Sequence, residues 1–78
     1  MIHELDQVIL TKDIPAKGLR QGDIGTVVLV HKDNAGFEVE FVALDGEHLA
    51  LVTAMPEGIR SVEPNEVPHA RPFESAQS

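Results

Sequence analysis

The chain has 78 residues, enough for one small domain, and it has no cysteine to form a disulfide or a thiolate metal site. Its 13 acidic and 6 basic residues give a formal net charge of -7, which disfavours extensive binding to nucleic-acid phosphates. The first residues do not resemble a secretory signal, and no apolar run is long enough to cross a bilayer. We therefore expect a cytoplasmic protein that does not enter membranes.

Five short segments have the β-branched or alternating apolar composition that is typical of strands. They are residues 6–11, 24–31, 37–44, 47–53 and 59–62. A long loop is expected over residues 12–23, and Met55-Pro56-Glu57 predicts one turn of 3₁₀-helix before the last strand. Strands this short need to close on one another to bury their inner faces. The chain is therefore predicted to be all-β, a small SH3-like barrel of five short strands over residues 1–62.

The residues before and within the second strand are predicted to be structural. Gly18 and Gly22 are expected to let the long loop fold back, and Asp23 to accept backbone hydrogen bonds in its turn. Gly25 is expected to let the second strand bend and take part in both halves of the barrel.

Asp45-Gly46 predicts a two-residue hairpin turn of type I′, in which both residues have positive φ. In that register Leu44 lies opposite Glu47, Val42 opposite Leu49, and Glu40 opposite Leu51. One face of the hairpin then presents Phe37, Val39, Phe41, Ala50 and Val52 to the core. The other face collects Glu38, Glu40, Val42, Leu44, Leu49 and Leu51.

Two interpretations of this second face remain open. A β-bulge near Val42-Ala43 would turn Leu44 and Leu49 inward, because period-2 patterning fails where a bulge intrudes. Alternatively, the four aliphatic residues form an exposed patch with an acidic rim, which is typical of a contact with a partner protein or a second copy of the chain.

Residues 63–78 differ in composition from the rest of the chain. Three prolines, Pro64, Pro68 and Pro72, alternate with polar residues, so we expect an extended and flexible tail. The stretch Pro68–Phe73 has the two prolines and the aromatic residue that short recognition segments often contain. If this segment docks, Phe73 is the expected anchor.

The sequence shows no arrangement of residues that points to catalysis. Its serines, Ser61, Ser75 and Ser78, lie in the last strand or the tail, with no positioned base nearby in sequence. Four histidines are far apart and lack metal-ligand spacing, although His31 and His48 lie near strand ends. A barrel this small fills its interior with side chains. We predict no enzyme activity, no metal, no cofactor and no small-molecule substrate.

Several ordered segments together resemble a family of small bacterial proteins known only as a domain of unknown function. They are Leu5-Asp6-x-Val8, Leu10-Thr11-Lys12-Asp13-Ile14-Pro15, Gly18-Leu19, Gly22-Asp23-x-Gly25-Thr26-Val27-Val28, Glu38-Val39-Glu40-Phe41 and Leu44-Asp45-Gly46. The resemblance covers residues 4–62. It implies an SH3-like fold and carries no known activity or catalytic residues. Members are sometimes encoded beside toxin-like genes, which implies an antitoxin-like or immunity-like role.

A second resemblance covers only Gly22-Asp23-x-Gly25-Thr26-Val27, which is similar to the turn of KOW-type domains in ribosomal and transcription proteins. RNA-binding KOW modules usually have basic flanks, whereas this chain has the acidic residues Asp23, Asp33, Glu38 and Glu40 there. We expect an interaction module that binds a basic protein through the hairpin face and Phe73. The alternatives are a KOW-like RNA-binding or ribonucleoprotein-binding module and an accessory subunit of an enzyme.

Overall fold

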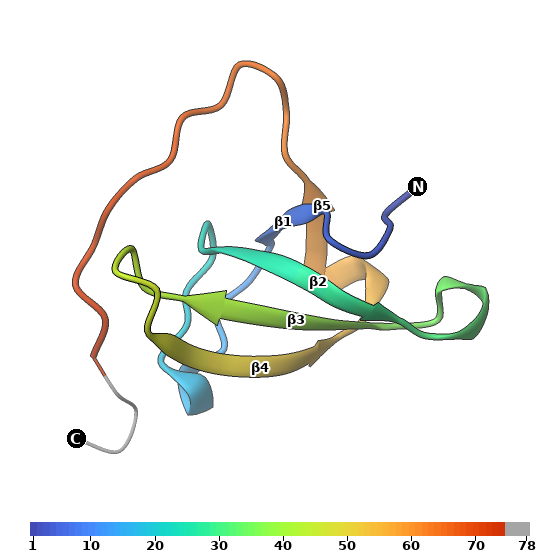
Figure 1. Ribbon diagram of the computed structural model, residues 1–78, viewed down its shortest axis with the longest axis horizontal. Helices are drawn as coiled ribbons and strands as arrows, with labels where there is room; N and C mark the ends of the chain where they lie inside the picture. Colours follow the sequence, from blue (N-terminus) through green and yellow to red (C-terminus); the bar gives the residue numbers. More distant parts are fainter. Residues whose placement is uncertain (75–78) are drawn as a thin grey trace.

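A computed structural model describes residues 1–74, and in it five antiparallel strands form one sheet (Figure 1). The strands are β1 (Gln7–Leu10), β2 (Ile24–Val30), β3 (Phe37–Val42), β4 (His48–Ala54) and β5 (Ile59–Ser61). Their order across the sheet is β4-β3-β2-β1-β5. Single 3₁₀ turns lie in three of the connections, η1 (Pro15–Lys17), η2 (Lys32–Asn34) and η3 (Pro56–Gly58). The prediction of an all-β chain with five short strands is confirmed.

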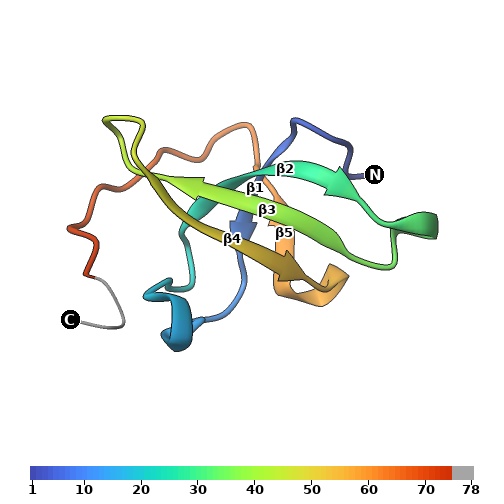
Figure 2. The ribbon, with the colours of Figure 1, turned by 60° about the horizontal axis from the view of Figure 1, so that its bottom comes forward.

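Strand β2 takes part in both halves of the sheet. Its first residues pair with β1, where Gly25 lies opposite Val8, and its later residues pair with β3. Thr26 is shared, because it lies opposite Gln7 on one side and Glu40 on the other. In Figure 2, β1 and β5 run across the layer that β2, β3 and β4 form. The sheet therefore curls around one core.

Gly25 allows this curl because no side chain fits at its position. A Cβ atom there would lie 2.6 Å from Val39 Cγ1 and 2.8 Å from Phe41 Cε2. Real Cβ atoms do not approach other atoms that closely, and protein interiors leave little room for adjustment. The close backbone approach at Gly25 is consistent with its predicted role, and its physical basis is close packing beneath the strand.

The core is built from the inward faces of all five strands and from Leu19 of the β1–β2 loop. Its buried members are Val8, Leu10, Leu19, Val27, Phe37, Val39, Phe41, Ala50, Val52, Ala54 and Ile59. The five hairpin residues predicted to face the core are all among them.

The β3–β4 turn differs from the predicted two-residue turn. The N–H of Ala43 donates to the carbonyl oxygen of Glu47, and the N–H of Gly46 donates to that of Ala43. Leu44, Asp45 and Gly46 therefore form a three-residue loop, in which only Gly46 has a positive φ, of 92°. A type I turn followed by a left-handed glycine is the usual form of such loops.

The longer loop shifts the register of the hairpin. Phe41 lies opposite Ala50 as predicted, but Val42 lies opposite His48 instead of Leu49. Leu49 is thus the extra residue of a bulge on β4, and it packs, partly buried, against the core. The expected bulge does turn Leu49 inward, but Leu44 stays at the tip of the loop with 97% of its surface exposed.

The β1–β2 loop folds back as predicted, with φ angles of 72° at Gly18 and 96° at Gly22. Its end is fixed to β1, because the N–H of Leu10 donates to the carbonyl oxygen of Asp23 and the N–H of Gly22 donates to that of Leu10. The loop therefore places Asp23 at a defined position beside the sheet.

The chain after β5 leaves the sheet through a turn that an ion pair fixes. Arg60 donates from Nη1 and Nη2 to the two carboxylate oxygens of Glu66, at 2.8 and 2.6 Å. Hydrogen bonds from Arg60 and from the backbone N–H of Glu63 lower the pKa of Glu66 to about 2. Beyond this turn the chain runs along the outside of the molecule toward the β3–β4 loop (Figure 1).

Replacing Gly25 with alanine tests whether its missing side chain is required. We expect Gly25→Ala to lower the free energy of unfolding by about 1–3 kcal/mol, because the added methyl group overlaps Val39 and Phe41. Urea unfolding measures the change. Gly58→Ala is the matched control, since its Cβ would meet only Lys12 Cε at 3.6 Å, and it should be neutral or slightly stabilising. Equal effects of the two substitutions would contradict the packing argument.

Candidate functional site

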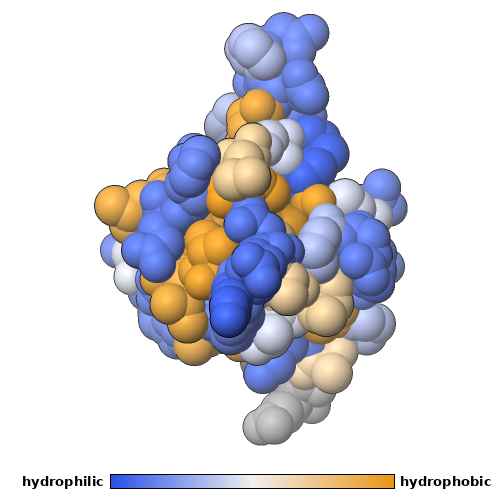
Figure 3. Space-filling view, turned by 90° about the vertical axis from the view of Figure 1, so that its right-hand side faces the viewer, coloured by the Kyte–Doolittle hydropathy of each residue, from blue (hydrophilic) through white to orange (hydrophobic). Residues whose placement is uncertain are grey.

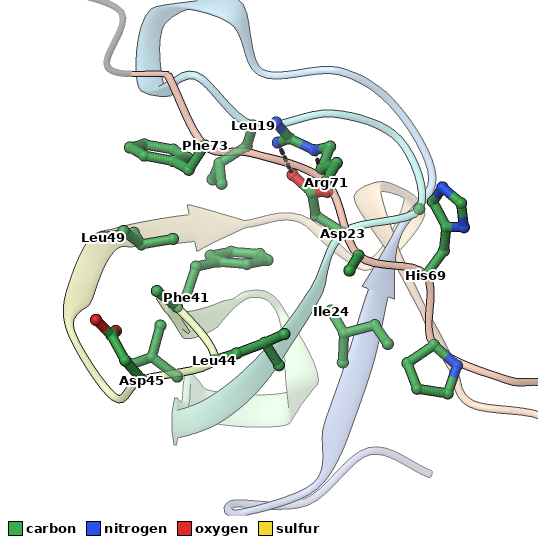
Figure 4. Close-up of a pocket in the computed structure, with 15 residues that line it drawn as sticks. Leu19, Asp23, Ile24, Phe41, Leu44, Asp45, Leu49, His69, Arg71 and Phe73 are labelled. Atoms are coloured by element: carbon green, nitrogen blue, oxygen red, sulfur yellow. Dashed lines mark hydrogen bonds and ion pairs between the residues drawn. The ribbon is translucent and has the colours of Figure 1, made fainter.

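A concave feature lies between the β3–β4 hairpin and the C-terminal segment. We call residues 68–73 the strap, because they cross over a hollow of about 490 Å³ (Figure 4). The floor and walls of this hollow come from the sheet and its loops, mainly Leu19, Ile24, Phe41, Leu44 and Leu49. The hollow lies on the outer surface beside the core, and most of its lining is apolar.

Arg71 fixes the strap to the β1–β2 loop. Its Nε donates to Oδ1 of Asp23 at 3.0 Å, and its Nη2 donates to Oδ2 at 2.5 Å. Nη2 also donates to the carbonyl oxygen of Gly18 at 3.1 Å. The side chains of Arg71 and Asp23 are only 22% and 19% exposed. Such a two-point pairing of arginine with a carboxylate is among the stronger polar contacts in proteins.

Asp23 is held ready for this pairing by its own loop. Its Oδ2 accepts a hydrogen bond of 2.8 Å from the backbone N–H of Arg20, which confirms the predicted role of the residue in its turn. Burial raises the pKa of the Asp23 carboxyl, but the hydrogen bonds from Arg71 and from the Arg20 backbone more than offset this effect. The net result is a pKa below the ordinary value, so Asp23 is an anion at neutral pH.

Phe73 provides the second contact of the strap. The ring is partly buried and packs against the core cluster. It lies directly over Gly18, where an added Cβ would come within 3.2 Å of Phe73 Cε1 and 2.7 Å of the Glu74 carbonyl oxygen. Phe73 therefore does anchor the docked segment, and Gly18 serves this contact as well as its turn. Residues 75–78 lie outside the described residues, and with them Ser75 and Ser78, the two serines of the tail that the sequence analysis considered.

The outer face of the hairpin carries the exposed residues that the sequence pointed to as a partner surface. Leu44 is 97% exposed, and Val42 and Leu51 are each 50% exposed. Glu38 and Glu40 lie on the same face, each half-buried. Leu49 is the exception, since the bulge moves it from this face into the wall of the hollow.

The two glutamates of this face are each paired with a histidine. Glu38 lies 2.7 Å from Nε2 of His31 and accepts a hydrogen bond from Thr53, and these contacts lower the pKa of its carboxyl. Glu40 lies 2.9 Å from Nδ1 of His48. His31 and His48 therefore bind different glutamates and do not converge on one point. Over residues 1–74, no three histidine, aspartate or glutamate side chains gather as a metal site would require.

Exposed apolar residues also occur at the opposite end of the sheet. Figure 3 looks onto the β2–β3 loop, where hydrophobic residues surround a hydrophilic projection. Val28, Leu29 and Met55 are 42–51% exposed. These residues do not line the hollow under the strap, whereas Val42 and Leu44 of the hairpin do. None of the helices in residues 1–74 is long and apolar enough to cross a membrane.

Sequence reasoning missed the pairing of Arg71 with Asp23. The two residues are separated by 48 positions, and each is ordinary for its local setting, a turn aspartate and a basic residue in a proline-containing tail. Only the unusual order Arg71-Pro72-Phe73, with a cation beside a proline and an aromatic residue, hinted at a docking segment.

Comparison with known proteins identifies a family but no activity. A family model described as a domain of unknown function, DUF4926, matches residues 4–61. Asp23 and Gly18 lie within the matched stretch, and the strap lies beyond it. No curated protein and no solved structure matches the chain.

Acidification tests the contact between the strap and the β1–β2 loop. Because the folded-state pKa of Asp23 is lowered, its contribution to docking is present above the ordinary value of 3.8 and is lost as the pH falls through the lower, folded value. We expect the NMR signals of the Phe73 ring to stay unchanged down to pH 3.8 and to move below it, together with the Asp23 carboxyl carbon. In Arg71→Gln, the pKa of Asp23 should rise to its ordinary value or above. An Asp23 pKa at or above 3.8 in the unmodified chain would contradict the described pairing.

Proposed function

The chain belongs to the DUF4926 family, and we propose that it is a non-enzymatic protein-interaction module, an antitoxin-like or immunity-like protein that binds a basic partner. The observation that carries the proposal is the exposed aliphatic tip of the β3–β4 hairpin. Leu44 is almost fully exposed and Val42 is half-exposed, and both line the apolar hollow. Leu51, farther along β4 and opposite Glu40, is half-exposed as well. Apolar surface of this kind is costly to leave in water, and a partner protein would cover it.

The negative charge of the chain supports the proposal that the partner is a basic protein. The net charge of -7 surrounds the hairpin with a negative potential that speeds the encounter with a cationic surface. Glu47 is exposed beside Leu44, and Glu40 is only half-buried next to Leu51. An acidic rim around an apolar centre is a common plan for a protein contact, in which the centre contributes affinity and the rim contributes selectivity.

The fold supports a role that uses the outer surface. The shared strand β2, the strand order and the 3₁₀ turn η3 before β5 support the finer description of the fold as a small SH3-like barrel, which we include in the proposal. The core is filled by side chains, and the hollow lies outside it. Asp23, the partly buried carboxylate at this hollow, is paired with Arg71 and is therefore unsuited to act as a general base.

Introducing positive charge on the outer face of the hairpin tests this proposal. We expect Leu44→Lys combined with Leu51→Lys to reduce the amount of a basic protein captured from the native cell by about tenfold or more, because it removes the apolar contact and repels the partner. Quantitative mass spectrometry of the captured proteins measures the loss. Val67→Lys is the control, since Val67 is 85% exposed but lies outside the hollow.

The identity of the captured protein separates the alternatives. A nuclease-like protein that the double variant loses supports the antitoxin-like role. Equal capture by the double variant and the native chain would remove the hairpin as the binding surface. Recovery of ribosomal proteins, with a salt-sensitive shift of RNA in gels, would replace the proposal by an RNA-binding role.

A further inference from the structure

The contact between Arg71 and the β1–β2 loop is specific for a guanidinium group. Two hydrogen bonds run from Nε and Nη2 to the two oxygens of Asp23, and a third runs from Nη2 to the carbonyl oxygen of Gly18. A lysine ammonium lacks the planar fork that makes these bonds together. The accepting atoms of these three bonds all belong to the loop, whereas Nη1 donates to the carbonyl oxygen of Pro72 in the strap itself. The loop therefore forms a seat for an arginine side chain.

An apolar contact lies beside this seat. The ring of Phe73, two residues after Arg71, rests on Gly18 and against the core. An added Cβ at Gly18 would approach the ring to within 3.2 Å, so the backbone there offers a flat surface on which an aromatic ring lies in close contact. The loop thus accepts an arginine and an aromatic residue two positions later.

The strap covers the hollow without filling it. His69 and Ala70 line the hollow of about 490 Å³, but both residues are exposed, and the side chain of Ala70 is a single methyl group. Figure 4 shows Ile24, Phe41, Leu44 and Leu49 around the hollow, with His69 at its edge. A volume of this size accommodates one or more large apolar side chains.

We propose that the loop seat and the hollow form a peptide-recognition site, and that the strap occupies this site within the free chain. The site takes an extended segment of a partner protein in which a large apolar residue directly precedes an arginine and an aromatic residue follows two positions later. This inference rests on the proposed function, and it names the segment through which a basic partner binds. Asp23 supplies the complementary charge, and the apolar residue enters the hollow that Ala70 leaves open.

Occupation by the strap makes binding competitive. A segment on the same chain is present at an effective concentration on the order of millimolar, so a separate peptide binds well only when the strap is displaced or disabled. A partner segment that fills the hollow gains contacts that the strap lacks. The strap therefore excludes ligands that bind weakly, and a ligand that binds more tightly displaces it.

A labelled synthetic peptide of residues 66–74 tests the site in the full-length chain. The receptor is the Arg71→Glu, Phe73→Ala variant, whose own strap can no longer pair with Asp23. Fluorescence anisotropy should show saturable binding to this variant, and binding to the native chain should be weaker by about tenfold or more because the site is occupied. The same peptide with Ala70→Leu should bind roughly tenfold more tightly, since it buries three more carbon atoms in the hollow.

Two matched controls locate the binding. The peptide with Arg71→Lys should lose about tenfold or more in affinity, because it cannot make the two-point contact. Asp23→Asn in the receptor should cause a similar loss, while its amide oxygen still accepts the bond from the Arg20 N–H. Binding that is unaffected by either change would overturn the proposal, and so would the absence of binding to a receptor that NMR shows to be folded.

Four further outcomes complete the test. If the double variant does not fold, Arg71→Gln replaces it as the receptor with the same expectations.

A concentration-dependent dimer of the native chain that Arg71→Glu abolishes would assign the site to the strap of a second copy and overturn occupation within one chain. Peptide binding without capture of a basic partner would support this site while removing the proposed function, and capture without peptide binding would remove only this site.

Discussion

The close contact beneath Gly25 is the constraint on which the remaining structure depends. A chain of this size, without disulfides, has a single core, and its second strand pairs with β1 and β3 in turn. The bend that allows this brings the strand backbone onto Val39 and Phe41, where no side chain fits. Once the sheet has curled, its inward residues fill the core, and only the outer surface is left for contact with other molecules.

The hairpin bulge connects the fold to the candidate site. The three-residue loop moves Leu49 from the outer face into the wall of the hollow and leaves Leu44 exposed at the tip. One shift in register therefore produces both the exposed apolar tip and part of the hollow beside it. The hairpin face and the hollow are adjoining parts of one surface, so the proposed partner that covers Leu44 would lie within reach of the strap.

This surface carries two kinds of acidic group, which differ in exposure and in their partners. Glu38 and Glu40 are partly exposed and paired with histidines, so their effect on a partner is screened by water and salt. Asp23 is mostly buried, ionised and bonded to a single guanidinium. Such a carboxylate discriminates between arginine and other groups, whereas the exposed acids mainly favour the approach of a cation.

The sequence by itself determined the five strands, the core face of the hairpin and the turn roles of Gly18, Gly22 and Asp23, because alternation and turn residues act over a few neighbouring positions. Tertiary structure decided the type of the β3–β4 turn, since Asp45-Gly46 fits both a two-residue loop and the end of a three-residue loop. It also decided that Arg71 pairs with Asp23 and that Phe73 packs over Gly18. Contacts across 48 positions depend on how the whole sheet curls, and no local pattern records that geometry.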